Sequence, residues 1–147
     1  MTKTSSFGSL AGDVSVPFRV VLIDPQSDLP LKDSAGKEAF IDVLSAQSEV
    51  GRKFDKEQRA QFQRRAMRGR NQQIIEDDQL EVNIAKLARL TVDWYLVDPV
   101  SKEPIDVPLT VETATEFYSL PLAHPFYLQA FLGANEAANF IKGSAKT

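Results

Sequence analysis

The chain has 147 residues, 43% of them hydrophobic and 25% charged, which is typical of one soluble domain with its own core. It contains no cysteine, so disulfide bonds, a thiolate nucleophile and a cysteine-ligated zinc site are excluded. No segment approaches the roughly 20 apolar residues that a membrane-spanning helix requires. We expect a cytoplasmic protein with a flexible head over residues 1–16, a single domain over 17–141 and a flexible tail over 142–147.

Charge is distributed unevenly along the chain. Residues 52–70 hold eight Lys or Arg side chains and two acidic ones, a local charge of +6 in a chain whose formal net charge is −3. The rest of the chain therefore carries −9. Such a dipolar molecule is expected to dock onto oppositely charged surfaces, including a second copy of itself.

Two ten-residue stretches share one pattern: an apolar pair, Asp-Pro, one residue, Ser, two residues, Pro and an apolar residue. They are Leu-Ile-Asp-Pro-Gln-Ser-Asp-Leu-Pro-Leu over 22–31 and Leu-Val-Asp-Pro-Val-Ser-Lys-Glu-Pro-Ile over 96–105. Asp-Pro favours a turn, because the proline ring fixes its own φ and the aspartate side chain can bond the backbone two residues on. The second proline lacks an N–H, so it belongs at the turn exit or on a sheet edge. The pattern predicts two β-ribbons separated by helical residues.

The first half of the chain is expected to form a hairpin and a long basic helix. β-Branched and aromatic residues over 18–23 predict a strand, and the alternation over 39–44 predicts its antiparallel partner. Ser45 or Ser48 can cap the helix, which is expected to end near Arg70. Sparse apolar residues predict that this helix touches the core along a narrow stripe: Val50, Phe54, Phe62 and Ala66.

The second half is expected to hold three more helices and the second ribbon. The acidic residues 76–78 are expected to open a helix whose apolar residues over 80–91 recur at three- and four-residue steps. Thr110 is a candidate cap for a short helix over 111–120, and His124-Pro125 is expected to begin the last helix. Small residues on one face of that helix predict close approach of a neighbouring helix. The predicted fold class is helix-dominated α+β, with an N-terminal β-hairpin, a second short β-ribbon and about four helices.

The sequence offers no catalytic constellation. The single histidine, His124, precedes a proline at an expected helix start, which favours a cap or a surface group over a ligand or base. Adjacent acids over 76–78 favour a role as helix-dipole partners, and their spacing matches no calcium loop. No glycine-rich phosphate loop and no Gly-x-Ser-x-Gly elbow is present. We therefore expect a protein that is not an enzyme and has no catalytic residues, cofactor or metal site.

The arginine run supplies the candidate binding residues: Arg59, Arg64, Arg65 and Arg68. These side chains are interpreted either as a solvated helix face or as a docking surface for an acidic partner. Nucleic acid is the less favoured partner, because the nearby aromatics Phe54 and Phe62 lie on the expected core stripe and are not free to stack on bases.

The order of motifs resembles the tail assembly chaperones of long-tailed bacteriophages and prophages, over about residues 18–140. The motifs that carry the resemblance are the Asp-Pro-x-Ser-x-x-Pro-Leu ribbon, the Arg-rich helix after Ser-Glu-Val, Leu-Thr-Val-x-Trp over 90–94, the helix capped by Leu109 and Thr110 with Phe117-Tyr118, and Ala138-Asn139-Phe140. The chain departs from the pattern at Asp93, where a small residue often stands, and in a longer second turn over 100–107.

The resemblance implies a non-catalytic assembly factor that coats the tape-measure protein, keeps it soluble and recruits tail-tube subunits. It implies no fixed site residues, and a homo-oligomer in the cytoplasm of an infected or lysogenic bacterium is expected. Two alternatives stay open: a small nucleic-acid-binding regulator that uses the basic helix over 52–70, and a minor structural protein of the tail or connector.

Overall fold

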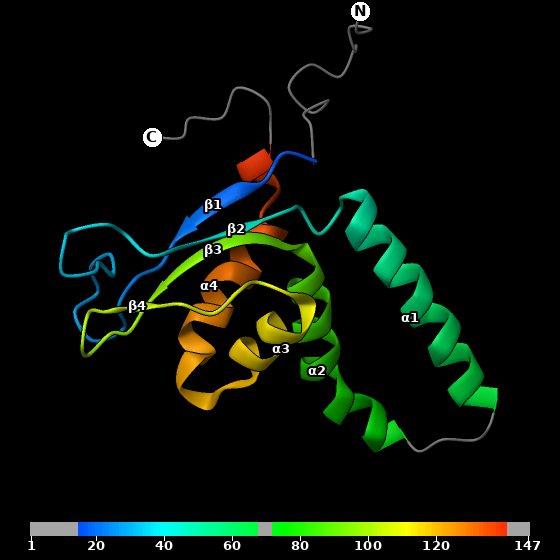
Figure 1. Ribbon diagram of the computed structural model, residues 1–147. Coiled ribbons are helices and arrows are strands. Elements are labelled where there is room, and N and C mark those ends of the chain that lie inside the picture. The colour runs from blue at the N-terminus through cyan, green and yellow to red at the C-terminus, as the bar shows by residue number, and fades with distance from the viewer. Residues whose placement is uncertain (1–14, 68–71, 141–147) are drawn as a thin grey trace, which may run out of the picture.

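The computed structural model describes residues 15–67 and 72–140 (Figure 1). The elements in chain order are β1 (Phe18–Val21), β2 (Phe40–Val43), α1 (Glu49–Met67), α2 (Gln72–Leu90), β3 (Thr91–Val97), β4 (Pro104–Ile105), α3 (Val111–Ser119), the 3-10 helix η2 (Pro121–Ala123), α4 (His124–Asn135) and the 3-10 helix η3 (Ala137–Phe140). The predicted fold class is confirmed, with four α-helices and an N-terminal hairpin. The head expected over 1–16 lies outside the described residues except for 15 and 16, as does the tail over 142–147.

The four strands form one antiparallel sheet in the order β1-β2-β3-β4. Phe40 of β2 lies opposite Tyr95 of β3, so the predicted hairpin and the predicted second ribbon join edge to edge. The sequence predicts each ribbon but not their union, because the pairing of β2 with β3 spans the whole α1–α2 segment. Helices α2, α3 and α4 lie against one face of the sheet (Figure 1), where Ile41 and Val43 are fully buried.

The small residues of α4 pack against the sheet. A Cβ added at Gly133 would lie 2.6 Å from Cγ2 of Val20 in β1, and the N–H of Ala46 donates to the carbonyl of Ala134 at 2.8 Å. Helices α2 and α3 pack against α4, so neighbouring helices are present as expected, but the partners at Gly133 and Ala134 are different. A strand and the segment after β2 approach α4 at this point.

Helix α1 touches the rest of the domain through very few apolar side chains. Ser48 is its cap, since its Oγ accepts from the N–H of Gly51 at 3.3 Å. Among the described side chains of α1, Phe54 is the one buried apolar group, at 2% exposure. The expectation that Phe62 lies on a core stripe is wrong, because Phe62 is 46% exposed. Helix α1 itself extends away from the sheet and from α3 and α4 (Figure 1).

Ion pairs hold α1 beside α2. Lys86 Nζ lies 3.0 Å from Asp55, and Arg89 Nη1 lies 3.3 Å from Glu57. The guanidinium of Arg89 also covers the ring of Phe54 at 5.0 Å. Two of the three acids of α1, Asp55 and Glu57, are thus paired with cations of α2.

The other helix boundaries follow local sequence signals with one exception. Helix α2 begins at Gln72, so the acids at 76–78 lie within it and do not open it. Thr110 caps α3 as predicted, in a reciprocal capping box with Thr113. Helix α4 begins at His124 with proline in its first turn, as predicted. No described helix is long and apolar enough to cross a membrane.

Candidate functional site

The two Asp-Pro stretches fold into the same turn, as their shared sequence predicts. In the first, Asp24 Oδ1 accepts from the N–H of Gln26 at 2.9 Å, and the Asp24 carbonyl accepts from the N–H of Asp28 at 2.8 Å. Ser27 Oγ accepts from the N–H of Leu29 at 3.3 Å, and the carbonyl of Leu29 accepts from the N–H of Asp24 at 2.8 Å. Asp28 adopts a φ of 63°, in the left-handed region that Asp tolerates better than most residues.

The second turn repeats each of these features. Asp98 Oδ1 accepts from the N–H groups of Val100 and Ser101 at 2.8 and 3.1 Å, and its carbonyl accepts from the N–H of Lys102 at 2.9 Å. Ser101 Oγ accepts from the N–H of Glu103 at 3.3 Å, and Lys102 has a φ of 62°. The backbone donors hold the pKa of Asp98 below its ordinary value. The repeat is therefore a structural repeat as well as a sequence one.

The two turns lie side by side at one end of the sheet. Lys102 Nζ of the second turn lies 3.6 Å from Oδ2 of Asp24 in the first, whose side chain is buried. The carbonyl of Lys102 also accepts from the N–H of Ser34 at 3.2 Å. These contacts fix one hairpin relative to the other.

An apolar groove of about 300 Å³ opens beside the two hairpins. Equivalent positions of the repeat form two of its walls: Leu22 and Leu31 come from the first hairpin, and Leu96 and Ile105 from the second. The remaining lining is Val97, Asp98, Pro99, Val100, Phe117, Leu120, Leu122, Ala123 and Phe126. Asp98 is the one charged residue in this lining. The groove is therefore suited to apolar groups.

The rim of the groove leaves large apolar side chains in water. Leu122 of η2 is 93% exposed and Val100 of the second turn is 86% exposed, while Leu120 and Ile105 are 49% and 38% exposed. Single exposed apolar residues are ordinary, but several around one apolar groove indicate an interaction site. This groove is the candidate binding site of the domain.

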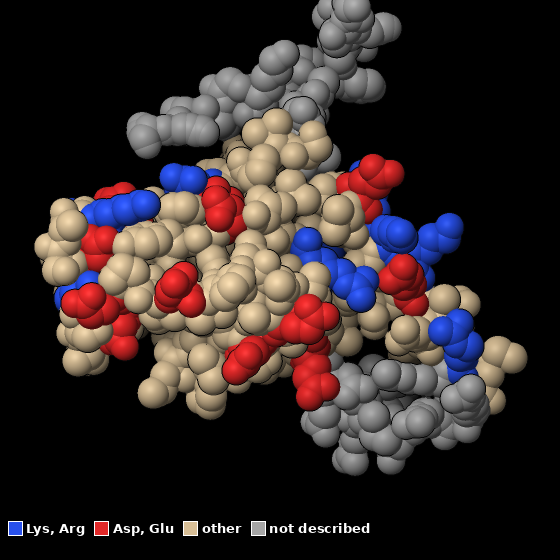
Figure 2. Space-filling view, in the orientation of Figure 1, with Lys and Arg blue, Asp and Glu red and all other residues tan. Residues whose placement is uncertain are grey.

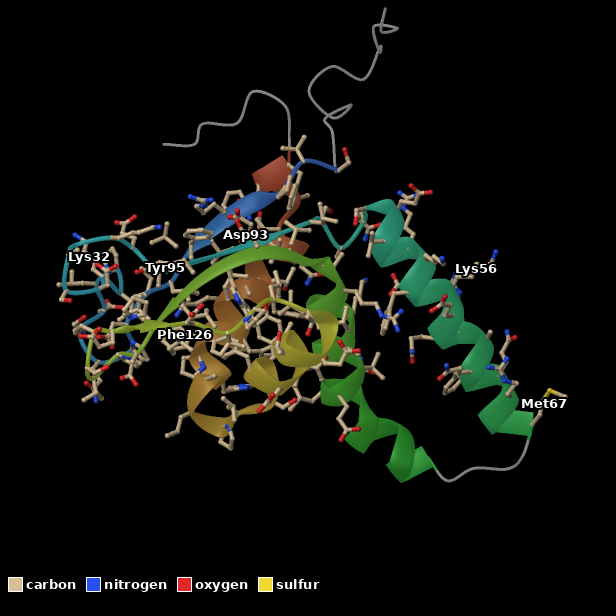
Figure 3. The ribbon with its side chains drawn as sticks, in the orientation of Figure 1. Lys32, Lys56, Met67, Asp93, Tyr95 and Phe126 are labelled. Atoms are coloured by element: carbon tan, nitrogen blue, oxygen red, sulfur yellow. The ribbon has the colours of Figure 1, made fainter. Side chains whose placement is uncertain are left out.

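Aromatic rings form the floor of the groove and connect it to the sheet. Phe117 stacks on Phe126 with ring centroids 6.5 Å apart, and Trp94 meets Phe117 edge to face at 5.7 Å. Trp94 Nε1 donates to the carbonyl of Val107 at 3.1 Å. Figure 3 shows Phe126 beneath the sheet. Trp94 is the only tryptophan of the chain, so its fluorescence reports on this floor.

The binding residues predicted from the arginine run lie elsewhere. Arg59 and Arg64 are exposed on α1, the helix from which Lys56 projects in Figure 3. The side chain of Arg65 and the whole of Arg68 lie outside the described residues. None of the described side chains of α1 lines the groove. The sequence analysis therefore missed the groove, although the two Asp-Pro stretches that it singled out contain eight of the thirteen lining residues.

The remaining candidate, His124, does not line the groove. His124 is exposed and stacks on Tyr127 with centroids 5.5 Å apart, which agrees with its interpretation as a surface group. Within residues 15–67 and 72–140, no group of three or more His, Asp or Glu side chains is placed to hold a metal ion.

The open face of the sheet carries two aromatic rings, but cations cover them. The Arg19 guanidinium lies 3.6 Å from the centroid of Phe40, and Lys37 Nζ lies 4.3 Å from that of Tyr95. The Tyr95 hydroxyl donates to the carboxylate of Asp33, which raises the pKa of Tyr95 and lowers that of Asp33. Phe40 is only 8% exposed. Neither of these two rings is therefore free to stack on a nucleic-acid base.

Comparisons with protein-family models, with curated proteins and with solved structures give no match to this chain.

Proposed function

We propose that this protein is a tail assembly chaperone of a long-tailed phage or prophage. In this proposal it works without catalysis in the bacterial cytoplasm, binds the tape-measure protein, keeps it soluble and recruits tail-tube subunits. The observation that carries the proposal is the apolar groove with its exposed rim, and the motif resemblance supports it. A chaperone for a long helical substrate needs such a surface more than it needs a polar pocket.

The size of the groove suits weak and repeated binding. A cavity of about 150 Å³ can hold benzene, so about 300 Å³ admits roughly two side chains of the size of Leu or Phe. Burying each such side chain contributes about 1.5–3 kcal/mol, which gives modest affinity at one site. Several copies bound along one substrate would reach high total affinity through multivalency.

Helix α1 supplies a second surface for assembly. Asp55 and Glu57 of this helix pair with α2, whereas Arg59 and Arg64 have no acidic partner among the described residues. We assign this basic face to contacts with acidic surfaces of neighbouring subunits, which include further copies of the chain.

Co-expression with the tape-measure protein of the same phage tests the proposal. The groove variant Val100→Gln/Leu122→Gln is compared with the control Leu128→Gln/Leu132→Gln, whose leucines are 44% and 66% exposed on α4 and do not line the groove. Because all four residues are exposed, both variants should fold like the wild type. We expect the groove variant alone to leave the tape-measure protein insoluble. Equal recovery with both variants would contradict the proposal.

The basic face of α1 also favours a second candidate function, a small nucleic-acid-binding regulator. In that case affinity for duplex DNA or RNA would fall linearly with the logarithm of salt concentration, and Arg59→Glu/Arg64→Glu would reduce the slope. A minor structural protein of the tail or connector would instead be present in purified particles.

A further inference from the structure

We infer that the groove selects helical protein segments in which large apolar side chains are flanked by lysine or arginine. The inference rests on the proposed function in one respect, because it concerns the ligand of the same groove. It adds a charge requirement that an apolar groove alone does not impose.

The part of the chain that builds most of the groove is strongly acidic. Residues 90–140 contain seven Asp or Glu side chains and one Lys or Arg, which is Lys102. Lys102 lies 3.6 Å from the buried carboxylate of Asp24, so its charge is already matched within the domain. A cationic ligand would thus meet little repulsion at this surface.

The acids lie next to the residues that line the groove. Asp98 is itself a lining residue, and the exposed Asp106 directly follows Ile105. The exposed Glu103 lies immediately before β4, two residues from Ile105 in the sequence. Hydrogen bonds from the backbone lower the pKa of Asp98, which keeps it ionised at neutral pH.

Helix α3 extends this acidic border away from the groove. Glu112 and Glu116 lie one turn apart on the same side of α3, and both are exposed. The exposed Leu120 caps the C-terminal end of the helix, four residues after Glu116. Leu120 also lines the groove. Acidic side chains are visible around α3 in the lower centre of Figure 2, whereas blue side chains gather along α1 at the right.

The geometry favours a helix over an added strand. β4 is only two residues long, and its Pro104 has no N–H to donate to an incoming strand. Recognition must then rely on side chains. A helix places apolar anchors three or four residues apart, and cations one turn away on the same face would reach Glu116 and Asp106.

Two labelled helical peptides test the inference directly. Both carry the same leucines, and the flanking positions are lysine in one and glutamate in the other. Anisotropy and Trp94 fluorescence measure binding to the full chain. We expect the lysine peptide to bind about tenfold more tightly at about 50 mM salt, and the difference to shrink to about twofold at about 500 mM.

Matched variants locate the effect. Glu116→Lys should remove most of the preference for the lysine peptide, whereas Glu136→Lys, the same exposed charge reversal away from the groove, should leave it unchanged. Val100→Gln/Leu122→Gln should weaken both peptides.

Three results would overturn the inference: equal binding of the two peptides, tighter binding of the glutamate peptide, or the same loss from both charge reversals. If any of these occurs while the tape-measure protein still depends on Val100 and Leu122 for solubility, the charge requirement is wrong and the proposed function stands. If neither peptide binds and that solubility is also independent of the groove, both fail.

Discussion

Replacing Trp94 with alanine is expected to lower the free energy of unfolding by about 3 kcal/mol. The indole lies at intermediate exposure on β3, opposite Ile41 of β2, with its edge against Phe117 and its Nε1 bonded to Val107. Because the indole connects the sheet to the floor of the groove, its removal should weaken the packing of both.

The magnitude follows from the contacts of the ring. An indole buries about 200 Å² when fully enclosed, and about half of that at 25 cal/mol per Å² gives roughly 2.5 kcal/mol. The edge contact with Phe117 adds about 0.5–1 kcal/mol, and the exposed hydrogen bond to Val107 adds little. Partial exposure thus places Trp94→Ala at the lower end of the roughly 3–5 kcal/mol typical of buried aromatic residues.

Urea unfolding followed by circular dichroism measures this change without requiring the tryptophan. Trp94→Phe is the matched control and is expected to cost only about 1 kcal/mol, because it retains the contact with Phe117. A loss below about 1 kcal/mol for Trp94→Ala would refute the reasoning. An emission maximum of the native wild type typical of fully exposed indole would refute it as well.

Three further predictions concern packing, pH and assembly. Gly133→Ala should destabilise the fold by about 1 kcal/mol in urea unfolding, since the clash with Val20 outweighs the gain in helix propensity. Burial raises the pKa of the Tyr118 hydroxyl, so above about pH 10 this tyrosine ionises in the unfolded chain but stays protonated in the folded one. The free energy of unfolding should then fall by about 1.4 kcal/mol for each further pH unit. Tyr118→Phe should remove this part of the decline in unfolding curves measured at alkaline pH. The wild type should self-associate at micromolar concentration, and Arg59→Glu/Arg64→Glu should weaken that association in sedimentation velocity at low salt; a wild type that stays monomeric would contradict this.

Local signals in the sequence predicted the elements, because turns and caps depend on neighbouring residues. The hydrogen bonds of Asp24 and Asp98, the cap by Thr110 and the helix start at His124 are all of this kind. The start of α2 was misplaced, since acids typical of a first turn also occur inside helices. Phe62 was wrongly assigned to the core, because helical spacing alone does not show which turns of a helix contact the rest of the domain.

The groove was beyond sequence reasoning because its walls come from segments far apart in the chain. Leu22 and Leu96 become neighbours only when β2 pairs with β3 and the two turns meet through Lys102 and Asp24. The one signal that pointed to it was the repeat, whose flanking apolar positions are equivalent in the two hairpins. The repeat predicts the two turns directly from neighbouring residues. It does not predict that the apolar residues flanking the turns line one groove, because this depends on tertiary packing.

Site-specific photo-crosslinking tests the central claim, that the groove holds the substrate, most directly. A photoreactive benzoylphenylalanine is placed at Leu122 on the rim of the groove or, as a control, at Leu132 on α4, and the chain is illuminated together with the tape-measure protein. We expect crosslinks from position 122 to apolar helical segments of the tape-measure protein, with few or none from position 132. Crosslinks of equal yield from both positions, or from neither, would contradict it.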